Sequence, residues 1–266
     1  IVMADKANPF YPSVLECTLK LLQRKGLRGI VSMADRDQQV VDLLPQLLEY
    51  QVDGLIITSA TLSSEMADQC ASIGVPVVLF NRSIPGSNAS AVCCDNRAAA
   101  RQVAELFIDR GMTRLGYIAG VENTSTNRDR ENSFFKRVSE AGLSKPARAS
   151  GHYTYEGGYQ AALELCSSEK YPEAIFCAND IMAMGAIDAI RTGLKLSVPE
   201  DISIVGFDDI ENCNWPIYNL TSVRPPVERM VKRSIESLLT NQNPEDSVQV
   251  VETMAAKIVH RGTVRQ

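Results

Sequence analysis

Side chains able to recognise a polar small molecule recur after short apolar runs along this chain. They combine carboxylates, arginines, amides and aromatic rings, at Asp5, Phe10, Arg82, Asp95, Asn127, Arg130, Tyr153, Asn179 and Asp208. Carboxylates and guanidinium groups can fix a ring of hydroxyls through paired hydrogen bonds. Aromatic faces can cover the apolar side of a sugar or stack on a planar base. These residue types therefore indicate a binding site for a polar small molecule.

Each of these residues also has a purely structural interpretation. Asn179 stands just before an expected helix and Asp208 just after an expected strand, and the oxygens of both could cap the free backbone N–H groups of a following helix. Arg130 lies in a run of mixed charge that is typical of a solvated helix face. Phe10 and Tyr153 can be ordinary core or rim aromatics. No single residue decides between the two interpretations.

The motifs of several enzyme classes do not occur in the sequence. It contains no G-x-S-x-G elbow, no P-loop and no G-x-G-x-x-G fingerprint. The only two histidines, His152 and His260, have no partner at the spacing of a metal site or catalytic triad. Carboxylate pairs of the kind used in hydrolysis stay open as an alternative at this point. We predict that the chain is not an enzyme and needs no cofactor.

Seven cysteines are scattered without any C-x-x-C pair, so we expect no metal site. Reduced thiols that fill core space, in a chain without a signal peptide, predict a cytoplasmic protein. The net charge of −5 and pI near 5.2 argue against this chain alone binding a nucleic-acid backbone. Because no apolar run reaches the roughly 18 residues of a membrane span, we expect no membrane partner.

Short β-branched runs alternate with helical apolar spacing, which is typical of βαβ units on parallel sheets. The expected strands are 1–3, 29–33, 54–57, 75–80, 91–93, 114–119, 149–153, 174–177, 202–207, 220–223, 248–252 and 256–260. The expected helices are 12–25, one around 40–48, one ending at 73, 97–109, 127–141, 156–167, 180–191 and 227–239. Two successive α/β series predict two similar lobes. The last helix and strands require several crossovers between them.

Ligands of open α/β sheets bind beyond the carboxyl ends of the strands. The candidate residues follow expected strands or open the next helix, so the topology predicts that they gather at those ends. A site formed there between two lobes would hold a polar small molecule.

Several long motifs, taken together, identify a family. They are residues 8–11, 51–57, 73–78, 94–97, 128–130, 175–186, 198–209 and 219–223, and they span nearly the whole chain in family order. The segment 198–209 reads Val-Pro-Glu-Asp-Ile-Ser-Ile-Val-Gly-Phe-Asp-Asp. In these motifs the chain resembles the effector-binding domain of LacI/GalR-family transcriptional regulators. That resemblance implies an α/β fold of the periplasmic-binding-protein type I, with two Rossmann-like lobes of parallel sheet.

The resemblance also assigns lobes and ligand contacts. It implies a first lobe of 1–109 plus 225–243 and a second of 110–224 plus 244–266. The positions that match the family's effector contacts are Asp5, Phe10, Arg130, Tyr153, Asn179 and Asp208. Arg82, Asp95 and Asn127 are weaker candidates. Two arginines near the cleft would suit an anionic sugar, such as a sugar acid or phosphate, whereas Asp5 and Asp208 favour a neutral polyol, so the ligand stays open.

Family members begin with a helix-turn-helix and a hinge helix. This chain starts within the first strand of the effector domain, so we expect it to bind operator DNA only through a missing N-terminal part. A homodimer is implied, in which the ligand biases the hinge between the lobes and shifts the DNA-binding heads. A periplasmic-type sugar-binding protein of a transport system is the alternative. Whether the ligand acts as inducer or corepressor is not readable from the sequence.

Overall fold

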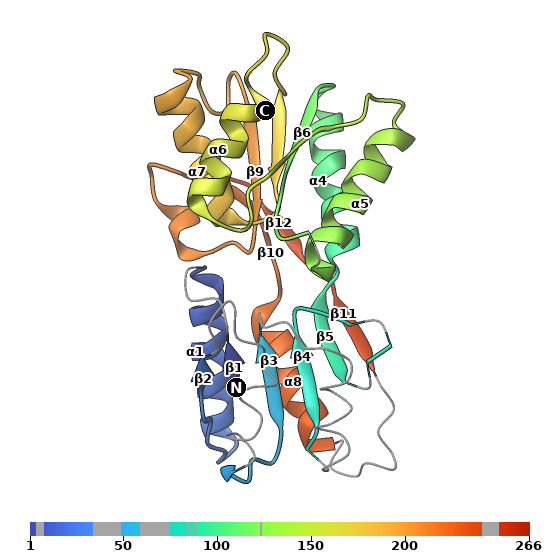
Figure 1. Ribbon diagram of the computed structural model, residues 1–266, viewed down its shortest axis with the longest axis vertical. Helices are drawn as coiled ribbons and strands as arrows, with labels where there is room; N and C mark the ends of the chain where they lie inside the picture. The colour runs from blue at the N-terminus through green and yellow to red at the C-terminus, as the bar shows by residue number, and fades with distance from the viewer. Residues whose placement is uncertain are drawn as a thin grey trace. The chain divides into compact units, whose positions relative to one another are not determined.

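The computed structural model describes residues 1–3, 8–33, 49–58, 75–84, 86–87, 89–122, 124–240 and 250–266. The chain divides into two units (Figure 1). Unit 1 comprises Ile1–Cys94 and Pro226–Met254, and unit 2 comprises Asp95–Pro225 and Ala255–Gln266, so the chain passes from one unit to the other three times. The helices expected around 40–48 and up to 73 lie outside the described residues.

Unit 1 is built on a parallel sheet with the strand order β11-β5-β4-β3-β1-β2. Its strands are β1 (Val2–Met3), β2 (Ser32–Met33), β3 (Leu55–Thr58), β4 (Val77–Phe80), β5 (Ser90–Cys94) and β11 (Val251–Met254). Helices α1 (Phe10–Arg24) and α8 (Val227–Thr240) pack against each other.

Continuous apolar runs explain the central strands of unit 1. Every residue of β3 and β4 is buried, and Ile56 pairs with Val78 in the parallel register. Strands that are covered on both faces lose the alternation of polar and apolar residues seen in half-exposed sheets. In α8, Met230, Val231, Ser234 and Ile235 are buried at helical spacing, which turns one face of the helix to the core.

Unit 2 has the strand order β12-β10-β9-β8-β6-β7, in which only β12 runs antiparallel to its neighbour. Its strands are β6 (Leu115–Ala119), β7 (Ala147–Ser150), β8 (Ala174–Cys177), β9 (Ser203–Phe207), β10 (Thr221–Arg224) and β12 (Lys257–Val259). Its helices are α4 (Asn96–Asp109), α5 (Ser125–Glu140), α6 (Tyr155–Leu165) and α7 (Asp180–Asp188). Helices α4 and α5 lie on one side of the sheet, and α6 and α7 on the other (Figure 1).

The two sheets share one winding order. In chain order each reads 2-1-3-4-5 across the sheet, followed by a strand from the C-terminal segment. Such a doubly wound sheet reverses direction between its first and third strands, and ligands bind outside the carboxyl ends at that switch point. In unit 2 the switch point lies between β6 and β8, both of which are described.

The core of unit 2 is aromatic where α4 and α5 meet the sheet. Phe107, Tyr117, Phe134 and Phe176 are fully buried. The Phe134 ring lies 5.4 Å from that of Phe176 and 6.0 Å from that of Tyr117, measured between ring centroids. Buried rings of this size contribute much of the apolar burial that stabilises a domain. This core fixes α5, which carries two predicted site residues, Asn127 and Arg130.

The structure confirms the α/β fold class with two mostly parallel sheets, and it differs from the sequence expectations in detail. Strand β7 covers 147–150 rather than 149–153, because His152 and Tyr153 have φ angles of 53° and 59° that no strand can contain. Helix α7 ends at Asp188 and continues as one π-helical turn, Ala189–Gly193. The units divide at 94/95, 225/226 and 254/255 instead of the expected 109/110, 224/225 and 243/244. The first boundary moves because α4 packs on α5, and the last moves because β11 pairs with β5 in the sheet of unit 1.

Candidate functional site

Arg130 is the best-defined polar side chain of unit 2. It is 2% exposed, and its guanidinium lies over the Phe207 ring at 3.4 Å from the centroid. Its Nε donates to Asn96 Oδ1 at 2.8 Å, and its Nη1 donates to the carbonyl of Ala178 at 2.5 Å. Its Nη2 lies 4.0 Å from Asp208 Oδ1. Stacking and hydrogen bonding hold the guanidinium rigid, with Nη2 directed to the carboxylate.

This placement follows from the topology. Helix α5 follows β6, Ala178 directly follows β8, and Phe207 ends β9, so Arg130 bridges the carboxyl ends of the central strands. Those ends include the switch point between β6 and β8. Arg130, Asn179 and Asp208, which the sequence placed at one edge, do lie at that edge of unit 2. We call these three residues and the supporting Asn96 and Phe207 the Arg130 cluster.

Asn179 is the N-cap of α7. Its Oδ1 accepts a hydrogen bond from the backbone N–H of Met182 at 3.0 Å, as an N-cap side chain normally does. The residue is 1% exposed, and its Nδ2 has no hydrogen-bond partner among the described residues. Because a buried amide donor without a partner is costly, a ligand oxygen is one partner that would satisfy this atom. The capping interpretation and the binding interpretation therefore apply to different atoms of one side chain.

Asp208 begins a loop with unusual backbone geometry. Asp208 and Asp209 have φ angles of 109° and 52°, in the region that side-chain-bearing residues rarely adopt. Asp209 is held by Arg224 and by Arg261, whose Nη1 lies 2.7 Å from Asp209 Oδ1. Strained backbone of this kind persists only where surrounding bonds fix it, and it is common at ligand sites. Asp208 itself is 7% exposed.

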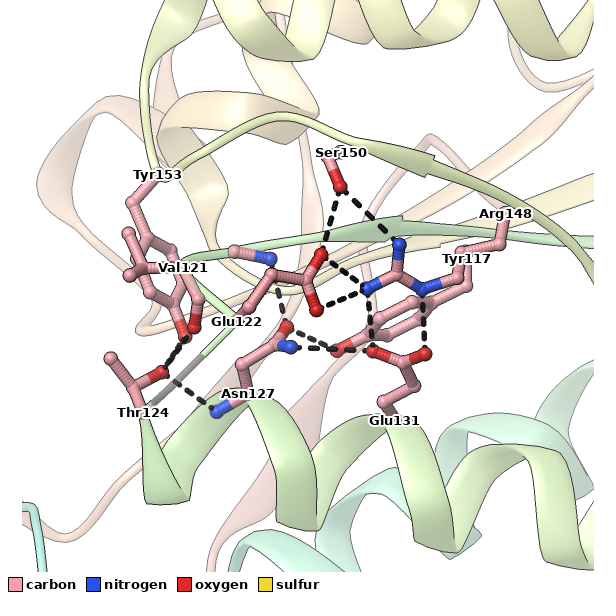
Figure 2. A network of polar contacts seen from close by, with 10 residues as sticks. Tyr117, Val121, Glu122, Thr124, Asn127, Glu131, Arg148, Ser150 and Tyr153 are labelled. Atoms are coloured by element: carbon pink, nitrogen blue, oxygen red, sulfur yellow. Dashed lines mark hydrogen bonds and ion pairs between the residues drawn. The ribbon is translucent and has the colours of Figure 1, made fainter.

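A second polar cluster also includes residues of α5. Figure 2 shows the Arg148 guanidinium between the carboxylates of Glu122 and Glu131. Arg148 Nε lies 2.6 Å from Glu131 Oε1, and Nη2 lies 2.7 Å from Glu122 Oε1. Hydrogen bonds to these carboxylates raise the pKa of Arg148 further, and the bond from Arg148 lowers the pKa of Glu122. We call Tyr117, Glu122, Asn127, Glu131, Arg148 and Ser150 the Arg148 network.

Asn127 belongs to the Arg148 network. Its Oδ1 accepts from Gly120 N at 2.8 Å and from the Tyr117 hydroxyl at 3.2 Å, and its Nδ2 donates to Glu131 at 3.3 Å (Figure 2). Both ends of the amide are therefore engaged inside unit 2. Its weaker ranking as a ligand contact has a physical reason, because binding a ligand would require breaking these bonds.

Tyr153 lies near the same network but makes few bonds. Its hydroxyl is within 3.2 Å of Thr126 Oγ1 and 3.4 Å of Thr124 Oγ1, and the residue is half-buried. A Cβ atom on Gly120 would lie 2.1 Å from the Tyr153 ring, so the ring packs directly on the glycine backbone. This close approach fixes the ring plane, which suits a surface that covers a ligand. The predicted contact itself stays a prediction.

The remaining predicted residues are not among the five that form the Arg130 cluster. Asp95 is the N-cap of α4, with Oδ1 accepting from Ala98 N at 2.9 Å. In unit 1, Phe10 opens α1, is 3% exposed, and meets the Tyr11 ring edge-to-face. Arg82 is half-buried after β4. Asp5 lies outside the described residues.

Sequence reasoning did not name the residues that hold Arg130. Asn96 and Phe207 both lie inside the motifs that carried the family resemblance, but a motif does not show which side chains support a ligand contact. Unit 1 also has a cavity of about 490 Å³, among whose lining residues are Leu22, Tyr50 and Leu238. None of the predicted site residues lines it.

The described part of the chain offers neither a metal-binding cluster nor a membrane-spanning helix. Among these residues, no group of three histidine, cysteine or carboxylate side chains is placed to hold a metal ion. No helix in the described ranges has both the length and the apolar character needed to span a bilayer.

Comparison with known proteins then decides the family. The model of the periplasmic binding protein-like domain matches residues 104–264. The chain belongs to this family. An HTH-type transcriptional repressor PurR from Pasteurella multocida is 25% identical over 270 residues, which covers 100% of this chain and 80% of the relative. The resemblance to LacI-type regulators is thereby confirmed, and relatives of this periplasmic binding protein-like domain include transcriptional repressors.

Solved structures agree with this assignment. A transcriptional regulator CelR in complex with cellobiose is 25% identical, with a TM-score of 0.88 over 98% of this chain and 83% of that one. A lac repressor dimer bound to operator and an anti-inducer has a TM-score of 0.87 over 99% of this chain and 92% of that one. At 23% identity the lac repressor supports the fold of this periplasmic binding protein-like domain.

Proposed function

We propose that this chain is the ligand-sensing domain of a LacI-type transcriptional regulator and that the Arg130 cluster binds its small-molecule ligand. Two observations at the buried edge of unit 2 carry the proposal. Asn179 Nδ2 has no partner among the described residues, and the Arg130 guanidinium is held rigid by stacking on Phe207. Preformed polar groups at a switch point are the usual design of a small-molecule site in doubly wound sheets.

The charge balance of the cluster favours a neutral ligand. The Arg130 guanidinium and the Asp208 carboxylate lie 4.0 Å apart, so their charges largely offset each other. The cluster then offers donors from Arg130 and Asn179 and an acceptor from Asp208. A hydroxyl group both donates and accepts, and this set suits a sugar or the sugar part of a nucleoside better than a sugar acid or phosphate.

The proposed mechanism is a shift between conformations. A ligand changes a conformational equilibrium only through its different affinity for the two states. Binding at the Arg130 cluster would stabilise the conformation in which Asp208 and Asn179 both reach the ligand. In a regulator, that conformation would differ from the other in its affinity for operator DNA, which a helix-turn-helix region would contact.

The regulator is proposed to act as a homodimer, and unit 2 carries an exposed patch suited to a second copy. Tyr155, Trp215 and Ile217 are 41%, 50% and 62% exposed. The hydroxyls of Tyr155 and Tyr218 both donate to Asp188 Oδ2, at 2.7 and 3.0 Å. We call these five residues the aromatic patch. Its carboxylate is already hydrogen-bonded, so two copies can meet about a two-fold axis without unscreened repulsion. The solved lac repressor is a dimer.

Thermal unfolding against a compound panel tests the ligand proposal. The panel contains ribose, cellobiose, other sugars and polyols, nucleosides, nucleobases, sugar acids and sugar phosphates. A ligand at about a hundred times its Kd adds roughly 2.7 kcal/mol, which raises Tm by several degrees. A neutral hydroxyl compound should stabilise wild type and fail to stabilise Arg130→Met. Stabilisation by sugar phosphates alone, or stabilisation that Arg130→Met retains, would contradict the proposal.

Analytical ultracentrifugation tests the dimer. Wild type should sediment as a dimer at micromolar concentration, and Ile217→Glu should sediment as a monomer. The matched control Val121→Glu changes an exposed apolar residue outside the aromatic patch. A monomeric wild type, or a dimer that survives Ile217→Glu, would refute this assignment.

A further inference from the structure

The loop after β9 has a strained backbone that other contacts must stabilise. Asp208 and Asp209 have φ angles of 109° and 52°, and the short helix Glu211–Asn214 follows at once. Residues with side chains adopt such φ angles only when neighbouring bonds compensate the strain. The loop carries Asp208 of the Arg130 cluster, so whatever fixes the loop also fixes one side of the proposed ligand site.

Asp180 lies beneath this loop and is completely buried. It is the first residue of α7, and its Oδ2 accepts hydrogen bonds from Ile210 N at 3.0 Å and from Cys213 Sγ at 3.2 Å. Its Oδ1 accepts from Ser222 Oγ on β10 at 2.6 Å. One carboxyl group therefore joins α7, the loop, the short helix and β10.

The backbone of β9 leaves room for this carboxyl. A Cβ atom at Gly206 would lie 2.1 Å from Asp180 Oδ1 and 3.2 Å from its Cγ. Any other residue at Gly206 would push the carboxyl away from Ser222 and the loop. The glycine that precedes Phe207 and Asp208 is thus explained by the Asp180 side chain.

The other side of the loop is anchored independently. The Asp209 carboxylate pairs with Arg224 and Arg261, and its backbone N–H donates to Ser222 Oγ at 3.1 Å. Ser222 is therefore shared, with Asp180 on one side and Asp209 on the other. The loop is held from below by Asp180 and from the outside by two arginines.

We propose that Asp180 is a positioning residue for the ligand site, which holds the loop from Asp208 to Cys213 so that Asp208 lies beside Arg130. The proposal rests on the proposed function, since that function gives Asp208 its role. Asp180 is not placed to touch the ligand, because its acceptors are occupied by the loop and by β10.

Because of its surroundings, Asp180 holds the loop through its hydrogen bonds rather than through its charge. The titratable groups facing it are Asp208 of the loop, Cys213 of the short helix and Cys177 of β8. Burial, and next the carboxylate of Asp208, raise the pKa of Asp180 to about 8. A protonated carboxyl keeps an oxygen that accepts from Ile210 and Cys213, and its O–H can donate to Ser222. An asparagine offers the same acceptor and donor in nearly the same shape.

The test measures the loop without any ligand. Hydrogen exchange of the peptide spanning 208–214 reports loop opening, and emission of Trp215, the single tryptophan, reports its surroundings two residues beyond Cys213. At pH 6.5, Asp180→Ala should exchange this peptide at least about tenfold faster than wild type and shift the emission. Asp180→Asn should behave as wild type. Val138→Ala is the matched control, because it destabilises the buried face of α5 without touching the loop.

A pH titration separates positioning from general stability. Trp215 emission of wild type should change with a midpoint near pH 8, and Asp180→Asn should lack this transition. If Asp180→Ala does not fold, Ser222→Ala and Cys213→Ala each remove one bond to the carboxyl and should give smaller increases in exchange. The proposal would be overturned if the 208–214 peptide exchanged at the wild-type rate in all three alanine variants. It would also be overturned if this peptide exchanged faster in Asp180→Asn than in the Val138→Ala control. A flat ligand panel would not, because no ligand is used.

Discussion

Two polar clusters involve residues of one helix of unit 2, α5, and they differ in which hydrogen-bonding atoms they leave unused. In the Arg148 network, the Asn127 amide is engaged at both ends and Arg148 lies between two carboxylates. In the Arg130 cluster, Asn179 uses only its oxygen, and its Nδ2 has no partner among the described residues. A network whose buried polar groups are all hydrogen-bonded stabilises the fold, whereas a buried donor without a partner is the feature on which the proposed ligand site rests.

The spacing on α5 explains why one helix serves both clusters. Asn127 and Glu131 are four residues apart and share one face, so they meet the Arg148 network together. Arg130 lies between them in sequence and reaches Ala178 and Asn96 instead. Residue type alone does not separate an arginine of the network from one of the ligand site.

The largest difference in ligand affinity should appear when Arg130 and Arg148 are each replaced by methionine. Arg130→Met removes the rigid donor that faces the ligand and leaves Asp208 buried without its cationic neighbour. Losing this charged donor to the ligand should reduce ligand affinity about a hundredfold. Breaking the buried pair with Asp208, which costs about 3–5 kcal/mol, should also lower Tm. Isothermal titration calorimetry and thermal unfolding measure the two quantities.

Arg148→Met provides the control for that exchange. It should lower Tm and leave ligand affinity within about threefold of wild type, since no atom of the Arg148 network is assigned to the ligand. Equal losses of affinity in the two variants would remove the distinction between the clusters.

The next effect concerns the pH dependence of stability. The pKa of Asp180 is raised from its usual 3.8 to about 8, so the folded state binds this proton more tightly than the unfolded chain does. Its contribution to the free energy of unfolding is fully present below pH 4 and is lost as pH rises through about 8. The slope is at most about 1.4 kcal/mol per pH unit.

Urea unfolding of wild type and Asp180→Asn from pH 5 to pH 9 measures this contribution. The difference between the two free energies of unfolding should change steadily up to about pH 8 and level off above it, with wild type losing stability relative to the variant. A difference that stays constant with pH would mean that Asp180 is ionised throughout.

A matched pair of asparagine substitutions should give a smaller effect with opposite signatures. Asn179→Ser keeps a side chain able to cap α7 but removes the buried amide donor. Ligand affinity should fall about tenfold to a hundredfold, with less than about 1 kcal/mol lost in stability, because one ligand hydrogen bond is removed.

Asn127→Ser should do the reverse. It breaks the bonds to Gly120, the Tyr117 hydroxyl and Glu131, so stability should fall by about 1–3 kcal/mol while affinity is retained. Calorimetry and urea unfolding of both variants decide the matter. Loss of affinity in Asn127→Ser alone would transfer the ligand site to the Arg148 network.

The smallest effect is expected at the exposed end of that network. The Glu122 side chain is 55% exposed, and ion pairs in such positions contribute little because water screens them. Glu122→Gln should change the free energy of unfolding by less than about 0.5 kcal/mol in urea titrations. A loss above about 2 kcal/mol would show that the whole network unfolds as one unit.

The sequence predicted the fold well because its signals were local. Buried strands such as Leu55–Thr58 and Ala174–Cys177 are short apolar runs, and helix α4 ends at Asp109 as expected. The predicted strand extended too far beyond the true end of β7, because the residue types of His152 and Tyr153 do not predict their positive φ angles. Assignment of α4 to unit 2 depends on helix packing, which periodicity does not report.

The candidate site was predicted less completely, because the order of residues does not show which side chains form hydrogen bonds with each other. Asn127 and Asn179 look alike in sequence, and only their partners show that one amide is engaged and the other is not. Asn96 and Phe207 support Arg130 from positions far along the chain. Asp180 stands next to Asn179 and would be taken for part of a helix start.

The most direct test of the ligand site is a crystal structure of the chain with the compound that gives the largest thermal shift. We predict that polar atoms of this compound lie within hydrogen-bond distance of Arg130 Nη2 and Asn179 Nδ2, with the Arg148 network unchanged. A compound bound to Asn127 and Arg148, or in the unit 1 cavity beside Leu22 and Leu238, would contradict the account.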